Sequence, residues 1–252
     1  MNNEIWICAA GLGLSSLLGS ALGALIKNIP HKWNDIFLGY CGGMMLAASI
    51  VCLIIPSVEM LDGVSLWQAL LGVIAGVAII SMLDHFTPHL HRLSGLEDME
   101  HHSTKSANRV LLFVMAIAIH KFPEGVATGI SFDGGDSTGS YSLAIAIALQ
   151  NIPEGMVVVT PLILVGIKGL RVLLVSLSVA LLETVGVIAG YMLGEISSML
   201  LPFLLATAGG AMLYVISDEM IPETHAHGFE KLATYALIAG VMTMLAIEKF
   251  AE

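Results

Sequence analysis

Charged side chains are scarce in this sequence. They make up 12% of its 252 residues, whereas hydrophobic side chains make up 56%. This composition argues against a water-soluble domain, because a chain with so much apolar surface is solvated mainly by lipid. We therefore expect an integral membrane protein of the all-α class, which contacts membrane lipid and does not bind nucleic acid.

The sequence also lacks two common patterns of zinc and disulfide chemistry. Its three cysteines, Cys8, Cys41 and Cys52, lie in apolar runs and form no C-x-x-C pair. Neither a disulfide framework nor a zinc knuckle is indicated. The string H-E-x-x-H, in which a helix presents two zinc-binding histidines and a general-base glutamate, is absent as well. A zinc-protease site of that type is therefore not expected.

Long apolar segments, by contrast, are frequent. A helix needs about 1.5 Å per residue to cross a hydrocarbon core of about 30 Å, and eight segments are long enough. They are residues 5–26, 36–58, 66–83, 109–130, 141–165, 170–193, 198–217 and 232–250. Most connections are short, and the longest is a His-rich loop near 84–108. We predict a single transmembrane domain over residues 1–252, built from eight helices.

Lysine and arginine alternate between the loops. The first, third, fifth and seventh loops or their edges hold Lys27, Lys32, Arg92, Lys105, Arg109, Lys168, Arg171 and Lys231. The even-numbered loops hold none. Basic residues concentrate on the cytoplasmic side, so we expect a multi-pass plasma-membrane protein with both termini outside. A cleaved signal peptide is not favoured, because the start MNNEIW carries no basic residue before the apolar run.

A ten-residue phrase with ionisable residues occurs twice. AIAIHKFPEG ends at Gly125 in the fourth segment, and AIALQNIPEG ends at Gly155 in the fifth. Charge at membrane depth is costly unless it is paired or hydrated, so such residues mark a functional site. Consecutive spans run antiparallel. The two copies therefore predict an inverted repeat whose twofold axis brings both polar patches together near the midplane.

The spacing within each copy places polar groups on one helix face. His120 and Glu124 are four residues apart, as are Gln150 and Glu154, and Asn151 lies three residues before Glu154. Imidazole, carboxylate and amide groups that converge in this way suit a borderline divalent cation. The pattern favours zinc, with iron, manganese and cobalt as alternatives.

Two prolines lie beside these polar groups. Pro123 and Pro153 have no backbone N–H, so we expect the fourth and fifth helices to kink there and to open carbonyl groups toward a cavity. Open backbone at membrane depth is tolerated only against protein or water. The prolines therefore support a hydrated or protein-lined site at this depth.

The paired HKFPEG and QNIPEG resemble the fourth- and fifth-helix signatures of the ZIP family of divalent-metal transporters. GGMMLAAS in the second segment, ETVG in the sixth and ISDEMIPETHAHG after the seventh also resemble bacterial ZIP sequences. The resemblance implies uptake of zinc, or of iron, manganese, cobalt or cadmium, across a bacterial inner membrane into the cytoplasm. It further implies elevator-like alternating access, no cofactor beyond the transported metal and no enzymatic activity.

The same resemblance implies a ligand set. By position, the central ligands are His120, Glu124, Gln150, Asn151 and Glu154, with Met45 completing the primary site and Glu183 beside a second metal position. Considered alone, Met45 is more typical of core packing, because methionine readily fills gaps.

Lys121 departs from the family pattern, which commonly has Asn at this position as a ligand of the second metal. We expect the Lys121 ammonium group to substitute for that second cation, so that one metal is transported. With Glu124, Glu154 and Glu183 ionised, one divalent metal and Lys121 bring the charge to zero, which a low dielectric favours. A structural ion pair between Lys121 and Glu154 is the alternative.

A path from the outside is suggested by the second segment. Met45, Cys52 and Glu59 recur every seven residues and would share one helix face, with Glu59 near the outer end. This stripe is a candidate metal entrance. Ordinary helix packing is the alternative, because heptad spacing is common in packed helices.

Histidines gather in the expected cytoplasmic loops. The candidate cytoplasmic metal-binding residues are His85, His89, His91, His101, His102, Glu219, Glu223, His225 and His227. Release, buffering or sensing of metal is one interpretation. A solvated loop with incidental histidines is the other.

Two other classes of protein are weighed against transport. An intramembrane metalloenzyme, either a protease or a lipid hydrolase, would also place His and acidic residues in apolar helices, but only His120 among the histidines lies in a predicted span. A structural scaffold would not need three buried glutamates. A homodimer is the expected oligomeric state, although the sequence holds no clear signal for it.

Overall fold

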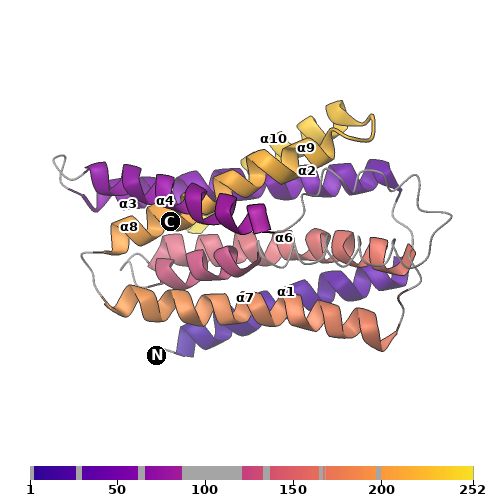
Figure 1. Ribbon diagram of the computed structural model, residues 1–252, viewed down its shortest axis with the longest axis horizontal. Coiled ribbons are helices and arrows are strands. Elements are labelled where there is room, and N and C mark those ends of the chain that lie inside the picture. The colour runs from indigo at the N-terminus through magenta and orange to yellow at the C-terminus, as the bar shows by residue number, and fades with distance from the viewer. Residues whose placement is uncertain are drawn as a thin grey trace.

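The computed structural model describes residues 3–26, 30–61, 66–86, 121–132, 137–164, 167, 169–196 and 200–251. Every regular element in these ranges is a helix, and the helices lie roughly along one long axis (Figure 1). This confirms the all-α class.

The helices are long and follow the predicted segments. They are α1 (Asn3–Ile26), α2 (His31–Ala48), η1 (Ser49–Ile54), α3 (Ile55–Glu59), α4 (Leu66–Phe86), α6 (Ser137–Leu164), α7 (Leu170–Ile196), α8 (Leu201–Val215), η5 (Ile216–Met220), α9 (Ile221–Thr224) and α10 (Glu230–Ala251). A further helix covers residues 121–131 and is called here the 121–131 helix.

Within the described residues, six helices are long and apolar enough to span a membrane, and a shorter apolar helix runs over Leu66–Met82. Two of the six are composite, because α2, η1 and α3 run on continuously over His31–Glu59, and α8, η5 and α9 do so over Leu201–Thr224. The fourth predicted span is described only from Lys121 onward. A multi-pass membrane protein is therefore established, while the count of eight spans remains a prediction.

The helices form two groups. The α6 group contains α1, α6, α7 and the 121–131 helix, and the α2 group contains α2 to α4 and α8 to α10. Figure 1 shows α1, α6 and α7 in the lower half and α2, α4 and α10 in the upper half. Across the boundary, α6 packs against α2, η1 and α10. Buried side chains such as Met44, Met45 and Ile147 belong to one apolar cluster that spans both groups.

Glycines permit very close helix contacts inside each group. A Cβ atom at Gly19 would collide with the backbone of Ile152, and one at Gly43 would collide with the backbone of Leu237. The same holds for Gly76 against Thr207 on α8, and for Gly125 against Glu183 on α7. Small residues allow such backbone approach in membranes, where dispersion contacts hold helices together. Each of these contacts joins two helices of the same group.

Two π-helical turns interrupt the α2 group, and each precedes a proline. η1 ends two residues before Pro56, and η5 ends two residues before Pro222. Proline cannot donate a backbone hydrogen bond, and a wider turn accommodates its ring. In the α6 group, helix α6 runs without interruption through Pro153. The kinks predicted at Pro123 and Pro153 remain predictions.

Both chain ends lie at the same end of the helix bundle (Figure 1). This arrangement agrees with an even number of membrane crossings.

Candidate metal centre

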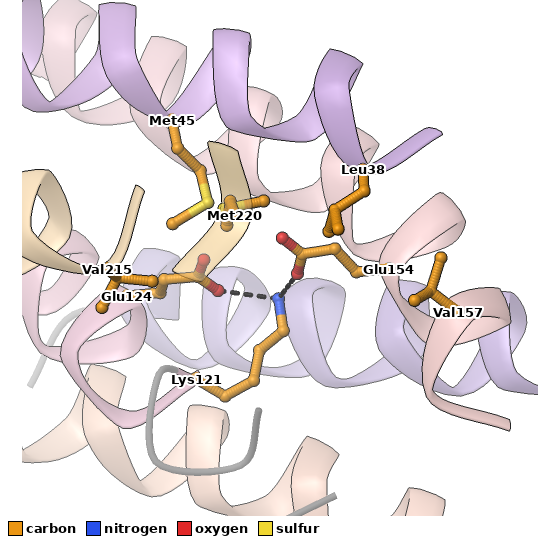
Figure 2. Close-up of a pocket in the computed structure, with 8 residues that line it drawn as sticks. All are labelled: Leu38, Met45, Lys121, Glu124, Glu154, Val157, Val215 and Met220. Atoms are coloured by element: carbon orange, nitrogen blue, oxygen red, sulfur yellow. Dashed lines mark hydrogen bonds and ion pairs between the residues drawn. The ribbon is translucent and has the colours of Figure 1, made fainter. Parts of the chain in front are cut away.

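A cavity of about 50 Å³ lies between the two helix groups (Figure 2). The residues that line it are Leu38, Met45, Lys121, Glu124, Glu154, Val157, Val215 and Met220. They come from α2, the 121–131 helix, α6, α8 and η5. A space of this volume with carboxylates on its wall is large enough for a cation or for water.

Lys121 is the central charge of the site. Its Nζ atom lies 2.7 Å from Glu124 Oε2, forms an ion pair with Glu154 Oε2 and donates a 2.6 Å hydrogen bond to Asn151 Oδ1. Lys121 is 3% exposed, Glu124 1% and Glu154 8%. Burying three charges is costly, and their mutual pairing offsets part of that cost. Figure 2 shows the ammonium group between the two carboxylates.

Gln150 is hydrogen-bonded to the second carboxylate oxygen of Glu124. Its Nε2 atom donates to Glu124 Oε1 over 3.1 Å, and its own Oε1 atom is buried and makes no hydrogen bond among the described residues. An amide oxygen with no donor partner at a carboxylate site is well suited to accept a cation. The hydrogen bond to Glu124 requires the Gln150 amide nitrogen, and not its oxygen, to face that carboxylate.

Glu183 joins the network through Asn151 and through a hydroxyl of helix α1. Its Oε1 atom accepts a 2.8 Å hydrogen bond from Asn151 Nδ2, and its Oε2 atom accepts one of 2.7 Å from Ser16 Oγ. Asn151 Nδ2 also lies 3.1 Å from Ser15 Oγ. Asn151 therefore connects Lys121 to Glu183, and α1 completes the network.

The predicted central residues are largely brought together. Glu124, Gln150, Asn151, Glu154 and Glu183 belong to the network around Lys121, and Met45 lines the cavity. His120 lies outside the described residues. Within the described residues, no three His, Cys, Asp or Glu side chains are placed to hold a metal ion. A complete site would therefore need His120, the amides or sulfur.

Sequence reasoning did not identify the apolar lining residues Leu38, Val157 and Val215, and it also missed two hydroxyls and one thioether of the site. Ser15 and Ser16 are hydroxyl neighbours in an otherwise apolar helix, which was a weak signal that could have been used. Met220 lies within a stretch that was assigned only to the cytoplasmic exit. Its contact with the central cavity depends on how η5 packs against α2, which no local pattern reveals.

The predicted entrance stripe is divided by η1. Cys52 is buried, its Sγ atom lies 3.5 Å from Glu248 Oε2 of α10, and it lines a second cavity of about 20 Å³. Glu59 is exposed. The heptad argument assumed an α-helical register, and the π turn between Met45 and Glu59 changes that register. The entrance role of the stripe remains a prediction.

The cytoplasmic candidates are described only in part. His89, His91, His101 and His102 lie outside the described residues, as do the side chains of His85 and Glu219. Glu223 is half-buried, and His225 is exposed with Nδ1 2.8 Å from the Ile221 carbonyl oxygen.

His227 pairs with a residue that the sequence did not single out. Its Nδ1 atom lies 3.0 Å from Oδ1 of the fully buried Asp35, and its ring stacks on His31 at 4.5 Å. An ionised carboxylate only accepts, so the contact with Asp35 requires a proton on Nδ1 and orients Nε2 away from that carboxylate. Asp35 Oδ2 is buried and makes no hydrogen bond among the described residues. A histidine held in this tautomer is oriented as metal-binding histidines usually are.

Comparison with known proteins gives consistent matches. The sequence profile described as ZIP Zinc transporter matches residues 91–248. Zinc transporter ZIPB of Bordetella bronchiseptica is 37% identical over 246 residues, which cover 94% of this chain and 79% of that protein. Zinc transporter GufA of Myxococcus xanthus is 39% identical over 251 residues, covering 95% and 98%. Zinc transporter ZupT of Clostridium perfringens is 31% identical over 276 residues, covering 97% and 95%.

Proposed function

Because this chain belongs to the ZIP zinc transporter family, we propose that it carries zinc into the cytoplasm through the cavity of Figure 2. The family and its relatives are named as transporters, so the intramembrane metalloenzyme is rejected. The observation that carries the proposal is that two buried glutamates, Glu124 and Glu154, face one cavity between two helix groups. Buried carboxylates at this depth are retained for ions rather than for packing.

The proposed ligands divide between the two groups. Glu124, Gln150 and Glu154 come from the α6 group, and Met45 comes from the α2 group. His120 directly precedes the 121–131 helix in the sequence. Nitrogen, oxygen and sulfur donors together suit a borderline cation such as zinc. Iron, manganese, cobalt and cadmium are the alternative substrates, and competition between metals decides among them.

Lys121 is proposed to take the place of a second metal. Its ammonium group contacts both carboxylates and Asn151, and Asn151 in turn contacts Glu183. With the Lys121 ammonium group held between the two carboxylates, the side of the carboxylates that faces Met45 remains available for one divalent metal. The alternative hypothesis, a purely structural ion pair between Lys121 and Glu154, predicts the same contact. It differs in predicting that replacing Lys121 changes the stability of the protein without changing the number of metals bound.

Transport is proposed to occur by sliding of the α6 group against the α2 group. Close glycine contacts join helices inside each group, whereas α6 meets α2 and α10 through side chains such as Met44 and Ile147. Side-chain contacts can be exchanged by a small shift, whereas backbone contacts at glycine fix two helices together. The carboxylates would move with the α6 group.

Metal is proposed to enter near Cys52 and Glu59 and to leave near Asp35 and His227. This direction follows from the basic odd-numbered loops, which place both termini outside the inner membrane of a bacterium. The His-rich loop near 84–108 and the segment from Glu219 to His227 would receive the released metal. A homodimer is proposed as the oligomeric state.

The proposal is tested with the purified chain in liposomes. Zinc uptake should require the protein and should fall to the background of empty liposomes in Glu124→Gln and Glu154→Gln, because each change removes a charged ligand. Glu4→Gln, an exposed site on α1, is the matched control and should retain uptake. Uptake that survives both central substitutions would rule out the cavity as the transport site.

A further inference from the structure

Met220 contributes a second thioether to the cavity wall. It is 7% exposed and lines the cavity together with Met45, which is 1% exposed. Figure 2 shows the two methionines near each other on one side, with Glu124 and Glu154 opposite them around Lys121. The sulfur-bearing side chains belong to α2 and η5, and the carboxylates belong to the 121–131 helix and α6.

The position of Met220 is fixed by the backbone around it. Pro222 has no N–H and cannot continue a regular α-helical hydrogen-bond ladder. The chain instead forms the π turn Ile216–Met220, in which the Ile221 N–H donates to the Ile216 carbonyl oxygen five residues earlier. Such single π turns are frequent at functional sites. Met220 is the last residue of this turn.

Met220 packs against α2 at Gly42. Its Cβ, Sδ and Cε atoms lie 3.8 to 4.0 Å from the point where a Cβ of Gly42 would be, which is ordinary van der Waals distance. The thioether therefore lies beside α2 three residues before Met45, whose side chain is in the same cavity wall.

From this arrangement we propose that Met220 is a second thioether ligand of the transported metal and tunes the cavity toward soft divalent cations. Thioether donors favour soft metals such as Cd²⁺, whereas carboxylate and water donors suit hard metals such as Mn²⁺. A neutral sulfur leaves the charge balance of the site unchanged. The inference rests on the proposed transport function and names the class of substrate that the same cavity prefers.

The competing explanation is that Met220 only fills space, as methionine often does. Leucine is the substitution that separates the two, because it keeps the volume and removes the sulfur. If Met220 only fills space, Met220→Leu should lower the uptake of all metals equally or leave it unchanged. If Met220 is a ligand, Met220→Leu should change the ratio of soft-metal to hard-metal uptake.

The experiment measures competitive uptake of Cd²⁺ and Mn²⁺ into liposomes. The variants are the native chain, Met220→Leu, Met45→Leu and Met212→Leu. Met212 is buried on α8 outside the cavity lining and serves as the control. Met220→Leu should lower the Cd²⁺ to Mn²⁺ ratio several-fold, while Met212→Leu should leave it unchanged. An unchanged ratio in Met220→Leu would overturn the inference.

X-ray absorption by bound Cd²⁺ gives a second readout that does not depend on how the Met220 variant folds. In Met45→Leu, a sulfur neighbour should remain if Met220 is a ligand, and its absence would overturn the inference. The two proposals fail in different ways. A native chain that transports zinc with no sulfur from Met220 contradicts only the ligand role, whereas a native chain that transports neither zinc nor cadmium contradicts the transport function.

Discussion

Lys121 Nζ donates a 2.6 Å hydrogen bond to Asn151 Oδ1, and these two residues occupy the same position in the duplicated phrases AIAIHKFPEG and AIALQNIPEG. The next-to-last residues of the two phrases, Glu124 and Glu154, both pair with that ammonium group. Equivalent residues of the two copies therefore meet around one nitrogen atom, as expected if a pseudo-twofold axis passes close to it. The departure from symmetry is the lysine itself.

Replacing Lys121 should change the number of metals at the centre. Lys121→Asn removes the internal cation and restores an amide beside Glu124 and Glu154, so we expect two bound metals where the native chain binds one. Metal-to-protein stoichiometry after gel filtration measures this. Lys231→Asn, at an exposed position on α10, is the control and should keep one metal. Two tightly bound central metals in the native chain would contradict the assignment.

Removing the hydroxyl of Ser16 should destabilise the protein and weaken transport. Ser16 donates to the buried Glu183, and loss of a donor to a buried acceptor costs about 1–3 kcal/mol. Ser16→Ala should therefore lower the thermal midpoint in detergent. Ser178→Ala is a fitting comparison, because that exposed hydroxyl donates to the Leu174 carbonyl oxygen of its own helix. Equal effects of the two substitutions would mean that Ser16 does not support the site.

A methyl group at Gly43 should separate α2 from α10. Its Cβ would collide with the Leu237 carbonyl group, and overpacking of this kind costs about 1–3 kcal/mol. Gly43→Ala should lower the thermal midpoint by several degrees. Gly11→Ala has open space around it and should be tolerated. If both variants unfold at the same temperature, close approach at Gly43 is not important for stability.

The pair of Asp35 and His227 should affect release rather than capture of metal. Asp35→Asn replaces a carboxylate, which can only accept from His227 Nδ1, with an amide that can either accept or donate, so the Nδ1–H tautomer is no longer enforced. We expect slower zinc release into the liposome lumen with unchanged binding at the central cavity. Stopped-flow fluorescence of a lumenal zinc indicator measures the rate. Thr234→Ala is the control, because this exposed hydroxyl on α10 donates to the Glu230 carbonyl oxygen of its own helix, and the variant should release zinc at the native rate.

Local sequence was sufficient for the network around Lys121, because each duplicated phrase encodes its own helix face. Glu124, Gln150, Asn151 and Glu154 meet as their spacing predicts, since four-residue intervals survive in any α-helix. The pattern of apolar residues also predicted where the long helices lie. The length of an apolar segment can be read from the residues of that segment alone.

Sequence was insufficient where tertiary packing or a changed helical period decides the contact. Met220 and Asp35 reach their partners from segments that are far away in the chain, and neither belongs to a repeated motif. The stripe from Met45 to Glu59 was inferred with a constant helical period, but Pro56 follows a π turn that changes it. Ser16 was overlooked because a hydroxyl in an apolar helix usually bonds to its own backbone.

In the proposed mechanism, the charge of Lys121 also determines how the membrane voltage acts on the transporter. With three glutamates ionised, the loaded site is neutral and the metal-free site carries a charge of −2. Voltage would then exert no force on the proposed inward step. It would drive the return step instead, because an inside-negative potential pushes a negative metal-free site outward by about 2.3 kcal/mol per elementary charge for each 100 mV crossed. An asparagine at this position would leave the metal-free site at −3 and make the return still more sensitive to voltage.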